Sequence, residues 1–242
     1  MKLSLQDVTL VAVASTKVNQ TIEALNFSSK DINFSEVCLL THLEPKVNSS
    51  IKLIKIKELI SIKDWSKFII YDLKDFISTQ FILLIHWDGF VINPKSWDYN
   101  FLNYDFIGSP WPKFEKAFPE IETQYPDKKF RVGNSVSLRS KKFLEIPSKI
   151  NLKWDLDAKI SNFHEDGYLC VQKRKELEKN AIKFAPFHLA CKFGREYTFK
   201  ENLNIDPFVF HKWYGKNKNY PILSHSFSMK ERVKRFLNFG FF

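Results

Sequence analysis

A short apolar run, FILLI at residues 81–85, most strongly constrains the fold of this chain. Its residues are apolar without alternation, which is typical of a strand buried on both faces, as in the middle of an α/β sheet. The run ends just before Asp88 and Gly89. Ligands of open α/β sheets bind at the carboxyl ends of the strands, and glycine lets the backbone turn sharply there. Asp88 therefore has two possible roles. It caps a turn, which is the simpler interpretation of this segment alone, or it is an oxygen ligand for a divalent cation held with a substrate's phosphates.

Strand-like and helix-like segments alternate before this run. The patterns predict buried strands at residues 8–14 and 37–41, a half-buried strand at 51–56, and helices at 18–27 and 65–77. Asp64 is expected to cap the second helix. This order predicts an α/β fold with a mostly parallel sheet flanked by helices.

Aromatic and irregular sequence follows, interrupted by prolines and glycines. We expect strands at 104–107, 131–140 and 181–186, a loop at 108–112, and a lid-like excursion at 115–130. Trp111 stands between two prolines on this loop. A tryptophan placed in this way is a stiff apolar platform that either stacks on a sugar ring or packs the loop down, and packing is the simpler interpretation.

Composition limits the class of protein. The chain has 242 residues, of which 44% are hydrophobic, enough to bury a sizeable core as one domain. Lysine and arginine exceed the acidic residues by 37 − 27 = 10. Such a surface attracts nucleotide phosphates, acidic lipids or nucleic acid, or is simply a solvated, lysine-rich surface. Three distant cysteines indicate neither a zinc site nor a disulfide framework and favour a reducing compartment.

The two ends of the chain bear on its location. No signal peptide and no apolar segment of about 20 residues is recognisable, so we expect a cytoplasmic protein. Residues 229–242 form a basic amphipathic stretch that either lies on an acidic membrane or docks on the domain, and docking is the simpler interpretation. We therefore expect a single domain at residues 1–215 followed by a basic tail at 216–242.

Glu165 and Asp166 open a stretch with helical spacing. Two acids at the start of a helix are stabilised by the helix dipole, so capping alone explains them. Used chemically, the pair would supply a base or a metal ligand at the edge of the sheet. No P-loop, GxGxxG, HExxH or GxSxG pattern is present, so none of the sites that these motifs build is indicated.

Six segments occur in a distinctive order between residues 8 and 211: HWDGFVINPKSW, FLNYDFIGSPWP, VGNSVSLRS, EDGYLC with KRKELE, IKFAP, and PFVFH. In this order they resemble a family of bacterial and viral proteins with GT-A-type glycosyltransferase character, long catalogued as a domain of unknown function. The resemblance implies a Rossmann-like sheet and a nucleotide-sugar-dependent transferase that works in surface glycan or polysaccharide synthesis. It also implies a nucleotide-sugar donor, a glycan or lipid-linked acceptor, and a divalent cation, Mn²⁺ or Mg²⁺.

The resemblance implies a metal site. Asp88 matches the last carboxylate of a DxD-type metal motif, present here as His86-Trp87-Asp88 with a histidine in place of the first acid. His211 resembles the C-terminal histidine that completes the metal shell in many enzymes of this kind. Taken alone, His211 would be interpreted as a packed or surface histidine.

The resemblance also implies a catalytic base. Glu165-Asp166 resembles the xED element near the acceptor, whose aspartate serves as general base in inverting enzymes of this fold. Asp166 is thus the expected base, and Glu165 its neighbour or an acceptor contact. Retention of the anomeric configuration is the alternative outcome, which product analysis by NMR would settle.

Further contacts are expected around these residues. Donor contacts are expected from Ser15, Thr16, His86, Trp87 and Arg139, and acceptor or sugar contacts from Trp111, Gly133 and Asn134. The family's glycine-rich GNGGFSLRS is shortened here to GNSVSLRS, so a glycine pair is lost. An altered donor specificity and an inactive relative are both compatible with that change.

A different class of function is a non-catalytic module whose positive charge and aromatic residues bind nucleic acid or acidic glycan. It ranks below the transferase because the basic residues are dispersed and form no RNA-binding signature, so no specific nucleic-acid partner is expected. Oligonucleotide binding that weakens steeply with salt, and that Asp88→Ala leaves unchanged, would favour it.

Overall fold

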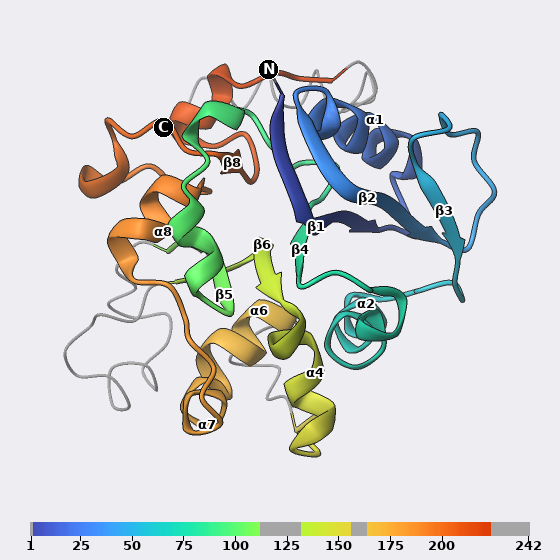
Figure 1. The fold of residues 1–242 in the computed structure, drawn as a ribbon, viewed down its shortest axis with the longest axis vertical. Coiled ribbons are helices and arrows are strands. Elements are labelled where there is room, and N and C mark those ends of the chain that lie inside the picture. The colour runs from blue at the N-terminus through green and yellow to red at the C-terminus, as the bar shows by residue number, and fades with distance from the viewer. Residues whose placement is uncertain (1, 112–131, 156–163, 224–242) are drawn as a thin grey trace.

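A computed structural model describes residues 2–111, 132–155 and 164–223 (Figure 1). A six-stranded sheet in the order β3-β2-β1-β4-β6-β5 forms its centre. The strands are β1 (Leu3–Val13), β2 (Ile32–Thr41), β3 (Lys52–Lys55), β4 (Phe81–Leu84), β5 (Phe106–Pro110) and β6 (Val132–Ser140). The pairs among β1, β2, β3 and β4 are parallel, and β6 runs antiparallel to both of its neighbours. The predicted α/β class with a mostly parallel sheet is confirmed.

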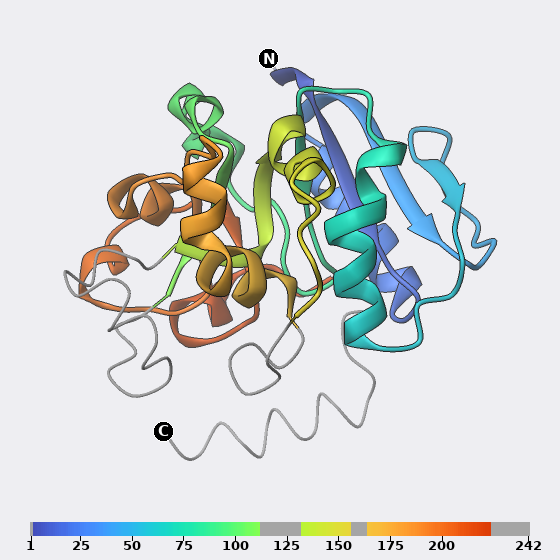
Figure 2. The same cartoon turned by 90° about the horizontal axis from the view of Figure 1, so that it is seen from below.

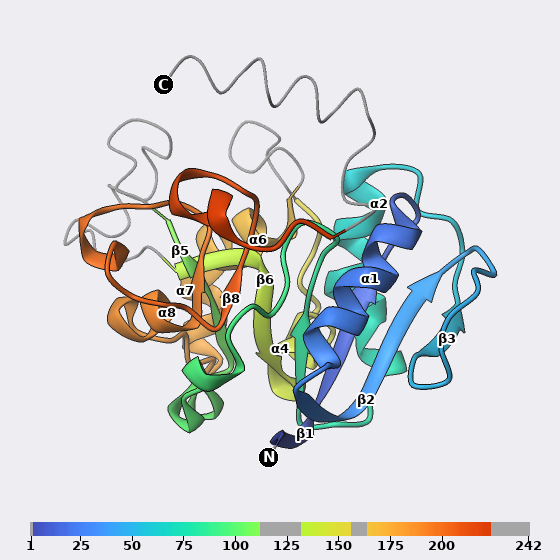
Figure 3. The ribbon, with the colours of Figure 1, turned by 90° about the horizontal axis from the view of Figure 1, so that it is seen from above.

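Helices cover both faces of this sheet. Helix α1 (Val18–Ser29) lies on one face, and α2 (Ile62–Lys67) on the other (Figure 3). Helix α2 continues through a π-helical turn, Phe68–Asp72, and a 3₁₀ turn, Leu73–Phe76. Helix α4 (Lys141–Lys149) packs beside this helical segment, as the yellow-green and teal helices of Figure 2 show.

Strand β1 shows why the sheet must be covered twice. Leu10 and Ala12 belong to the apolar cluster that includes Leu25 of α1, whereas Val11 and Val13 belong to the cluster on the opposite face. Successive side chains of a strand point to opposite faces, so an unbroken apolar run requires an apolar layer on each side.

The chain after β4 adds further short elements and a small second sheet. They are α6 (Glu165–Gly167), a π-helical turn (Tyr168–Gln172), α7 (Arg174–Lys179), α8 (Phe187–Phe193), β7 (Gly194–Arg195), β8 (Val209–Phe210) and 3₁₀ turns at Pro94–Ser96, Tyr99–Asn103, Lys200–Asn202 and Gly215–Asn219. Strands β7 and β8 are parallel, with Arg195 opposite Phe210.

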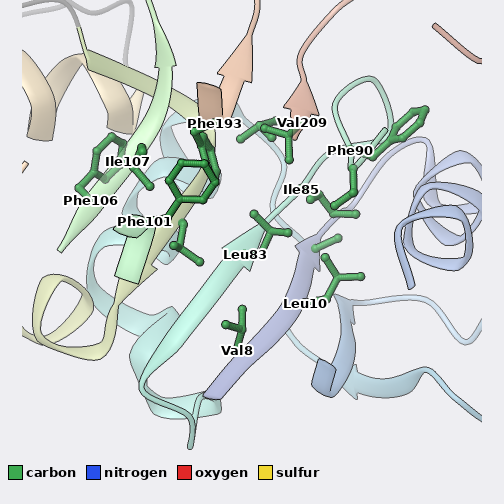
Figure 4. Close-up of a cluster of buried hydrophobic side chains, with 14 of the residues drawn as sticks. Val8, Leu10, Leu83, Ile85, Phe90, Phe101, Phe106, Ile107, Phe193 and Val209 are labelled. Atoms are coloured by element: carbon green, nitrogen blue, oxygen red, sulfur yellow. The ribbon is translucent and has the colours of Figure 1, made fainter. Parts of the chain in front are cut away.

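Buried aromatic rings join the two sheets into one core (Figure 4). Phe101 packs edge-on against Phe193 of α8, with ring centroids 5.4 Å apart, and Phe90 contacts Phe210 of β8 at 4.8 Å. All four rings are fully buried. Full burial of such a side chain contributes about 1.5–3 kcal/mol, so these rings hold the small sheet of β7 and β8 against the segment that follows β4.

Three local predictions are wrong. Strand β5 continues to Pro110, so residues 108–110 are part of the sheet and not of the predicted loop. Helix α2 begins earlier than predicted, because Ser61 is its cap and its hydroxyl accepts from the Asp64 backbone N–H at 3.1 Å. The segment at 181–186 is not a strand: it forms a single bridge between Phe184 and Phe106. Pro186 has no N–H to extend that pairing and serves instead as the N-cap of α8.

The end of the described chain remains packed on the domain. Asn217 is fully buried, and the Trp213 indole N–H donates to the Pro221 carbonyl at 3.2 Å. The packed region therefore continues past residue 215, where the tail was expected to begin. The predicted excursion at 115–130 and the basic stretch at 229–242 lie outside the described residues. In the part of the chain that is described, no helix is both long and apolar enough to cross a bilayer.

Candidate active site

A cavity of about 710 Å³ opens at the carboxyl ends of β1, β4, β7 and β8. Its lining includes residues 13–16, 59–62, 85–88, 134–135, 166–167, 196–197 and 211–212, together with Trp111 and His164. This is the edge at which open α/β sheets bind ligands. The predicted site residues Ser15, Thr16, His86, Trp87, Asp88, Trp111, Asn134, Asp166 and His211 all lie in this lining.

A tight turn after β4 brings two of the potential metal ligands to the cavity. His86 and Gly89 exchange backbone hydrogen bonds of 2.8 and 3.2 Å, so the intervening residues form the tip of the turn. A Cβ on Gly89 would come within 2.8 Å of the His211 ring and 3.0 Å of the Phe210 carbonyl. Glycine is therefore required here for the turn to lie directly against the end of β8.

This packing gathers His86, Asp88 and His211. One ligand atom from each lies within 4.8 Å of the others, and Asp88 Oδ1 is 3.7 Å from His211 Nε2. The prediction placed Asp88 and His211 in the metal site and His86 at the donor. The structure instead brings His86 into the same cluster. In the sequence, His86 occupies the position of the first acid of the DxD-type pattern.

The environment of His86 suits a metal ligand. Its Nε2 is buried and has no hydrogen-bond partner among the described residues. Burial, followed by the neighbouring His211, lowers the pKa of His86 to about 3, so the ring is neutral and keeps a free lone pair. A buried polar atom without a partner is costly, and a bound cation would remove that cost. Two imidazoles with one carboxylate match the ligands that first-row transition metals accept, whereas Mg²⁺ prefers oxygen alone. The residues present thus fit a divalent cation such as Mn²⁺.

Glu196 and Lys212 form a second layer of charge behind this cluster, with Glu196 3.5 Å from His211 and 3.0 Å from Lys212. Burial raises the pKa of Glu196, but His211 and Lys212 outweigh it and bring that pKa down to about 2. Burial lowers the pKa of His211, but the Glu196 and Asp88 carboxylates outweigh it, and the net shift is upward. Glu196 was not predicted, because only the pairing of β7 with β8 reveals that it lies beside His211. Lys212 was not predicted either, although it follows His211 directly in the sequence.

Asp166 lines the same cavity and belongs to the first turn of α6. Burial and the adjacent Glu165 charge raise its pKa to about 7, against the opposing effect of the Gly167 N–H, which donates to Oδ1 at 2.8 Å. A carboxyl group with a pKa near neutrality can take up and release a proton at physiological pH. Asp166 therefore lines the cavity with a pKa close to neutrality.

Glu165 and Arg139 do not line this cavity, so the donor contact predicted for Arg139 and the acceptor contact predicted for Glu165 are not seen, whereas Glu165 as a neighbour of Asp166 is in keeping with the structure. Their side chains are 0% and 1% exposed and form an ion pair of 2.7 Å beneath it. Ser135 donates to the other Glu165 oxygen at 3.1 Å, and Ser137 accepts from Arg139 Nε at 2.8 Å. With these groups mutually satisfied, Arg139 is not available to a donor phosphate, and Glu165 acts on the site through the Asp166 pKa.

The remaining predicted contacts divide between two sides of the cavity. Ser15 and Thr16 lie at the end of β1, where the Ser15 hydroxyl accepts from the Leu59 N–H at 2.9 Å. Trp87 lies nearby, with Lys17 Nζ 5.1 Å from its ring centroid.

Trp111 and Asn134 lie on the other side, and Gly133 lies behind them rather than in the lining. A Cβ on Gly133 would come within 2.0 Å of the Trp111 ring, so this glycine is what allows the ring to pack there. Asn134 has a φ of 85° and donates to Glu196. Trp111 is only 9% exposed, which places most of its ring in the core.

Comparison with known proteins gives one family and several distant structural similarities. No curated protein matches the chain. An active-site mutant of LgtC is 11% identical over 95% of both chains, with a TM-score of 0.48. The galactosyltransferase LgtC in complex with donor and acceptor sugar analogues is 13% identical over 95% of this chain and 94% of that one, with a TM-score of 0.45.

A glycosyltransferase involved in the glycosylation of the major capsid of PBCV-1 is 16% identical over 87% of this chain and 95% of that one, with a TM-score of 0.48. The family match covers more than half of the chain, residues 48–211, and thus includes the turn after β4, Asp166 and His211. The chain belongs to the family described as a protein of unknown function, DUF5672.

Proposed function

We propose that this protein is a cation-dependent glycosyltransferase that moves a sugar from a nucleotide-sugar donor onto an acceptor hydroxyl. The observation that supports the proposal most strongly is that one cavity holds both the His86, Asp88 and His211 cluster and a carboxylate, Asp166, whose pKa is raised to about 7. A cation site and a separate base at the edge of an α/β sheet are the two components that such a transfer requires.

The donor would lie with its diphosphate at the cluster and its nucleoside toward Ser15 and Thr16. A cation held by His86, Asp88 and His211 would neutralise the diphosphate and stabilise the charge that develops on the leaving nucleotide. The apolar lining at Leu59 and Ile60 leaves room for the flat face of a base.

The acceptor would lie between Asp166 and Trp111. Asp166 takes the proton of the acceptor hydroxyl while that oxygen forms its bond to the anomeric carbon and the bond to the nucleotide breaks. Attack from the side opposite the leaving group inverts the anomeric centre. We propose a glycan or a lipid-linked sugar as acceptor, and the cytoplasm as the compartment, which three buried free cysteines suit.

A donor panel tests this function. The protein is incubated with UDP-, GDP- and CMP-sugars and Mn²⁺, and nucleotide release is measured with and without a chelator. We expect release from at least one donor that the chelator abolishes, and inversion at the anomeric carbon by NMR once an acceptor is found. A folded protein that binds and turns over no donor across the panel would refute the proposal.

Three variants assign the roles. Asp88→Ala should abolish cation binding, whereas Asp166→Asn should bind cation and donor normally but transfer about 10²–10⁴-fold more slowly. Asp75→Asn is the matched control, because this carboxylate pairs with Lys74 outside the cavity lining. Equal transfer rates for Asp166→Asn and Asp75→Asn would remove Asp166 from the mechanism.

A further inference from the structure

Glu196 stands next to a proposed metal ligand at the matching end of a neighbouring strand. Strands β7 and β8 are parallel with Arg195 opposite Phe210, so the residues that follow them, Glu196 and His211, emerge side by side. Glu196 Oε1 lies 3.5 Å from His211 Nδ1, and both side chains are largely buried, with 5% and 10% of their surface exposed. The two residues therefore face each other inside the wall of the cavity.

The two nitrogens of His211 face different groups. Nε2 points to Asp88, 3.7 Å away, in the cluster that suits a cation. Nδ1 is buried and makes no hydrogen bond among the described residues, and the Glu196 carboxylate faces it at 3.5 Å. A neutral imidazole carries its proton on one nitrogen only, so a carboxylate facing Nδ1 favours the proton there and leaves the Nε2 lone pair free.

Glu196 is itself held in place by groups from other elements. Asn134 Nδ2 of β6 donates to its Oε2, and Lys212 Nζ lies 3.0 Å from Oε1. Asn134 adopts a φ of 85°, and its own Oδ1 accepts from the Val136 N–H at 2.9 Å. These contacts fix the carboxylate from two sides, so that it cannot turn away from His211.

A buried amide joins the two strand ends. Asn217 Nδ2 lies within hydrogen-bond distance of the backbone carbonyls of Arg195, Glu196, His211 and Lys212, at 2.9, 3.1, 3.4 and 3.0 Å. It thereby holds the backbone on which Glu196 and His211 sit. The spacing between these two side chains is thus set by the fold and does not depend on a ligand.

We propose that Glu196 is a positioning residue for the cation site: it orients His211 and selects the tautomer whose Nε2 faces Asp88 and His86. This inference rests on the proposed function, since it assumes that the cluster binds a cation. Carboxylates that accept from the second nitrogen of a metal-bound histidine typically contribute about 10–100-fold to metal affinity. Glu196 would touch neither donor nor acceptor, and its effect would pass through His211.

The matched pair Glu196→Gln and Glu145→Gln tests this role. Glutamine keeps the size of residue 196 but can donate to Nδ1, which favours the opposite tautomer. Glu145 is also ion-paired, with Lys149 at 2.6 Å, but lies on α4 outside the cavity lining. Mn²⁺ affinity is measured by calorimetry, and the His211 tautomer by long-range ¹H–¹⁵N spectra of the metal-free protein at a pH where the ring is neutral.

We expect the wild type and Glu145→Gln to show His211 protonated on Nδ1 and to bind Mn²⁺ equally. Glu196→Gln should lose this tautomer preference and bind Mn²⁺ about 10–100-fold more weakly. If Glu196→Gln does not fold, Glu196→Asp is used in its place. Aspartate keeps the charge but is one methylene shorter, so its carboxylate lies farther from His211. The Mn²⁺ affinity of this variant should also be lower than that of the wild type.

The outcomes separate the two proposals. If His211→Ala loses Mn²⁺ but the residue 196 variant keeps wild-type affinity and tautomer, the positioning role is overturned and the cation site stands. If the wild type binds no divalent cation, the proposed function is overturned, and this inference with it.

Discussion

Replacing Arg139 by methionine is expected to lower the free energy of unfolding by about 3–5 kcal/mol, the usual cost of leaving one partner of a buried ion pair uncompensated. The estimate follows from the side-chain exposures of 1% for Arg139 and 0% for Glu165 and from their contact of 2.7 Å. Without the guanidinium, the Glu165 carboxylate keeps, among the described residues, only the Ser135 hydroxyl. Because domains are stable by about 5–15 kcal/mol, the variant should fold but melt early.

A double-mutant cycle isolates the pair. Urea unfolding is followed by tryptophan fluorescence in the wild type, Arg139→Met, Glu165→Leu and the combined variant. Replacing a buried pair by apolar residues is often neutral or stabilising, so the combined variant should recover most of the loss. Costs that simply add would refute the reasoning. Loss of nucleotide binding by Arg139→Met at unchanged stability would restore the phosphate contact originally predicted for this arginine.

Three other perturbations follow from the site. Gly89→Ala should lower the free energy of unfolding by about 1–3 kcal/mol and weaken Mn²⁺ binding, because the new Cβ would come within 2.8 Å of the His211 ring. An unaltered dissociation constant for Mn²⁺ in calorimetry would contradict this. The value of kcat/KM should rise as the pH increases through about 7, because Asp166 loses its proton there. Glu165→Gln should shift this rise to lower pH, because the Glu165 charge raises the Asp166 pKa. A flat pH profile argues against Asp166 as the base. The Asp166 pKa is higher in the folded protein than its value of 3.8 in the unfolded chain, so the unfolded chain releases this proton first as the pH rises. The contribution of Asp166 to the stability of the fold therefore decreases between about pH 4 and pH 7. Asn217→Ala should lower the free energy of unfolding by about 1–3 kcal/mol, because buried carbonyls lose their donor. Equal midpoints of urea unfolding for this variant and the wild type would contradict this prediction.

The sequence was sufficient to predict the sheet because its strands carry strong local patterns. The apolar run at 81–85 appears as β4 in the interior of the sheet, between parallel β1 and antiparallel β6, as its lack of alternation indicated. The local sequence pattern predicts a strand less well where pairing with a neighbouring strand decides whether the strand forms. The segment at 181–186 is apolar enough for a strand, yet it meets β5 at only one bridge.

The candidate site was predictable in part for a similar reason. Asp88, Asp166 and His211 stand in recognisable segments, and all three line the same cavity. Glu196 stands in no such segment, since two-residue strands such as β7 and β8 leave no periodicity to detect. The position of Arg139 is a further limit, because a sequence does not show whether a charged residue in a strand points into a cavity or into a buried ion pair.

The central claim, that one cation and a donor diphosphate bind at His86, Asp88 and His211, is tested most directly by crystals soaked with Mn²⁺ and a nucleoside diphosphate. Anomalous diffraction at the manganese edge locates the ion without reference to activity. The account predicts one strong peak in contact with all three side chains and with the diphosphate, and it predicts that Asp166 is free of metal. A nucleotide bound elsewhere, or bound in this cavity with no ion at the cluster, would contradict it.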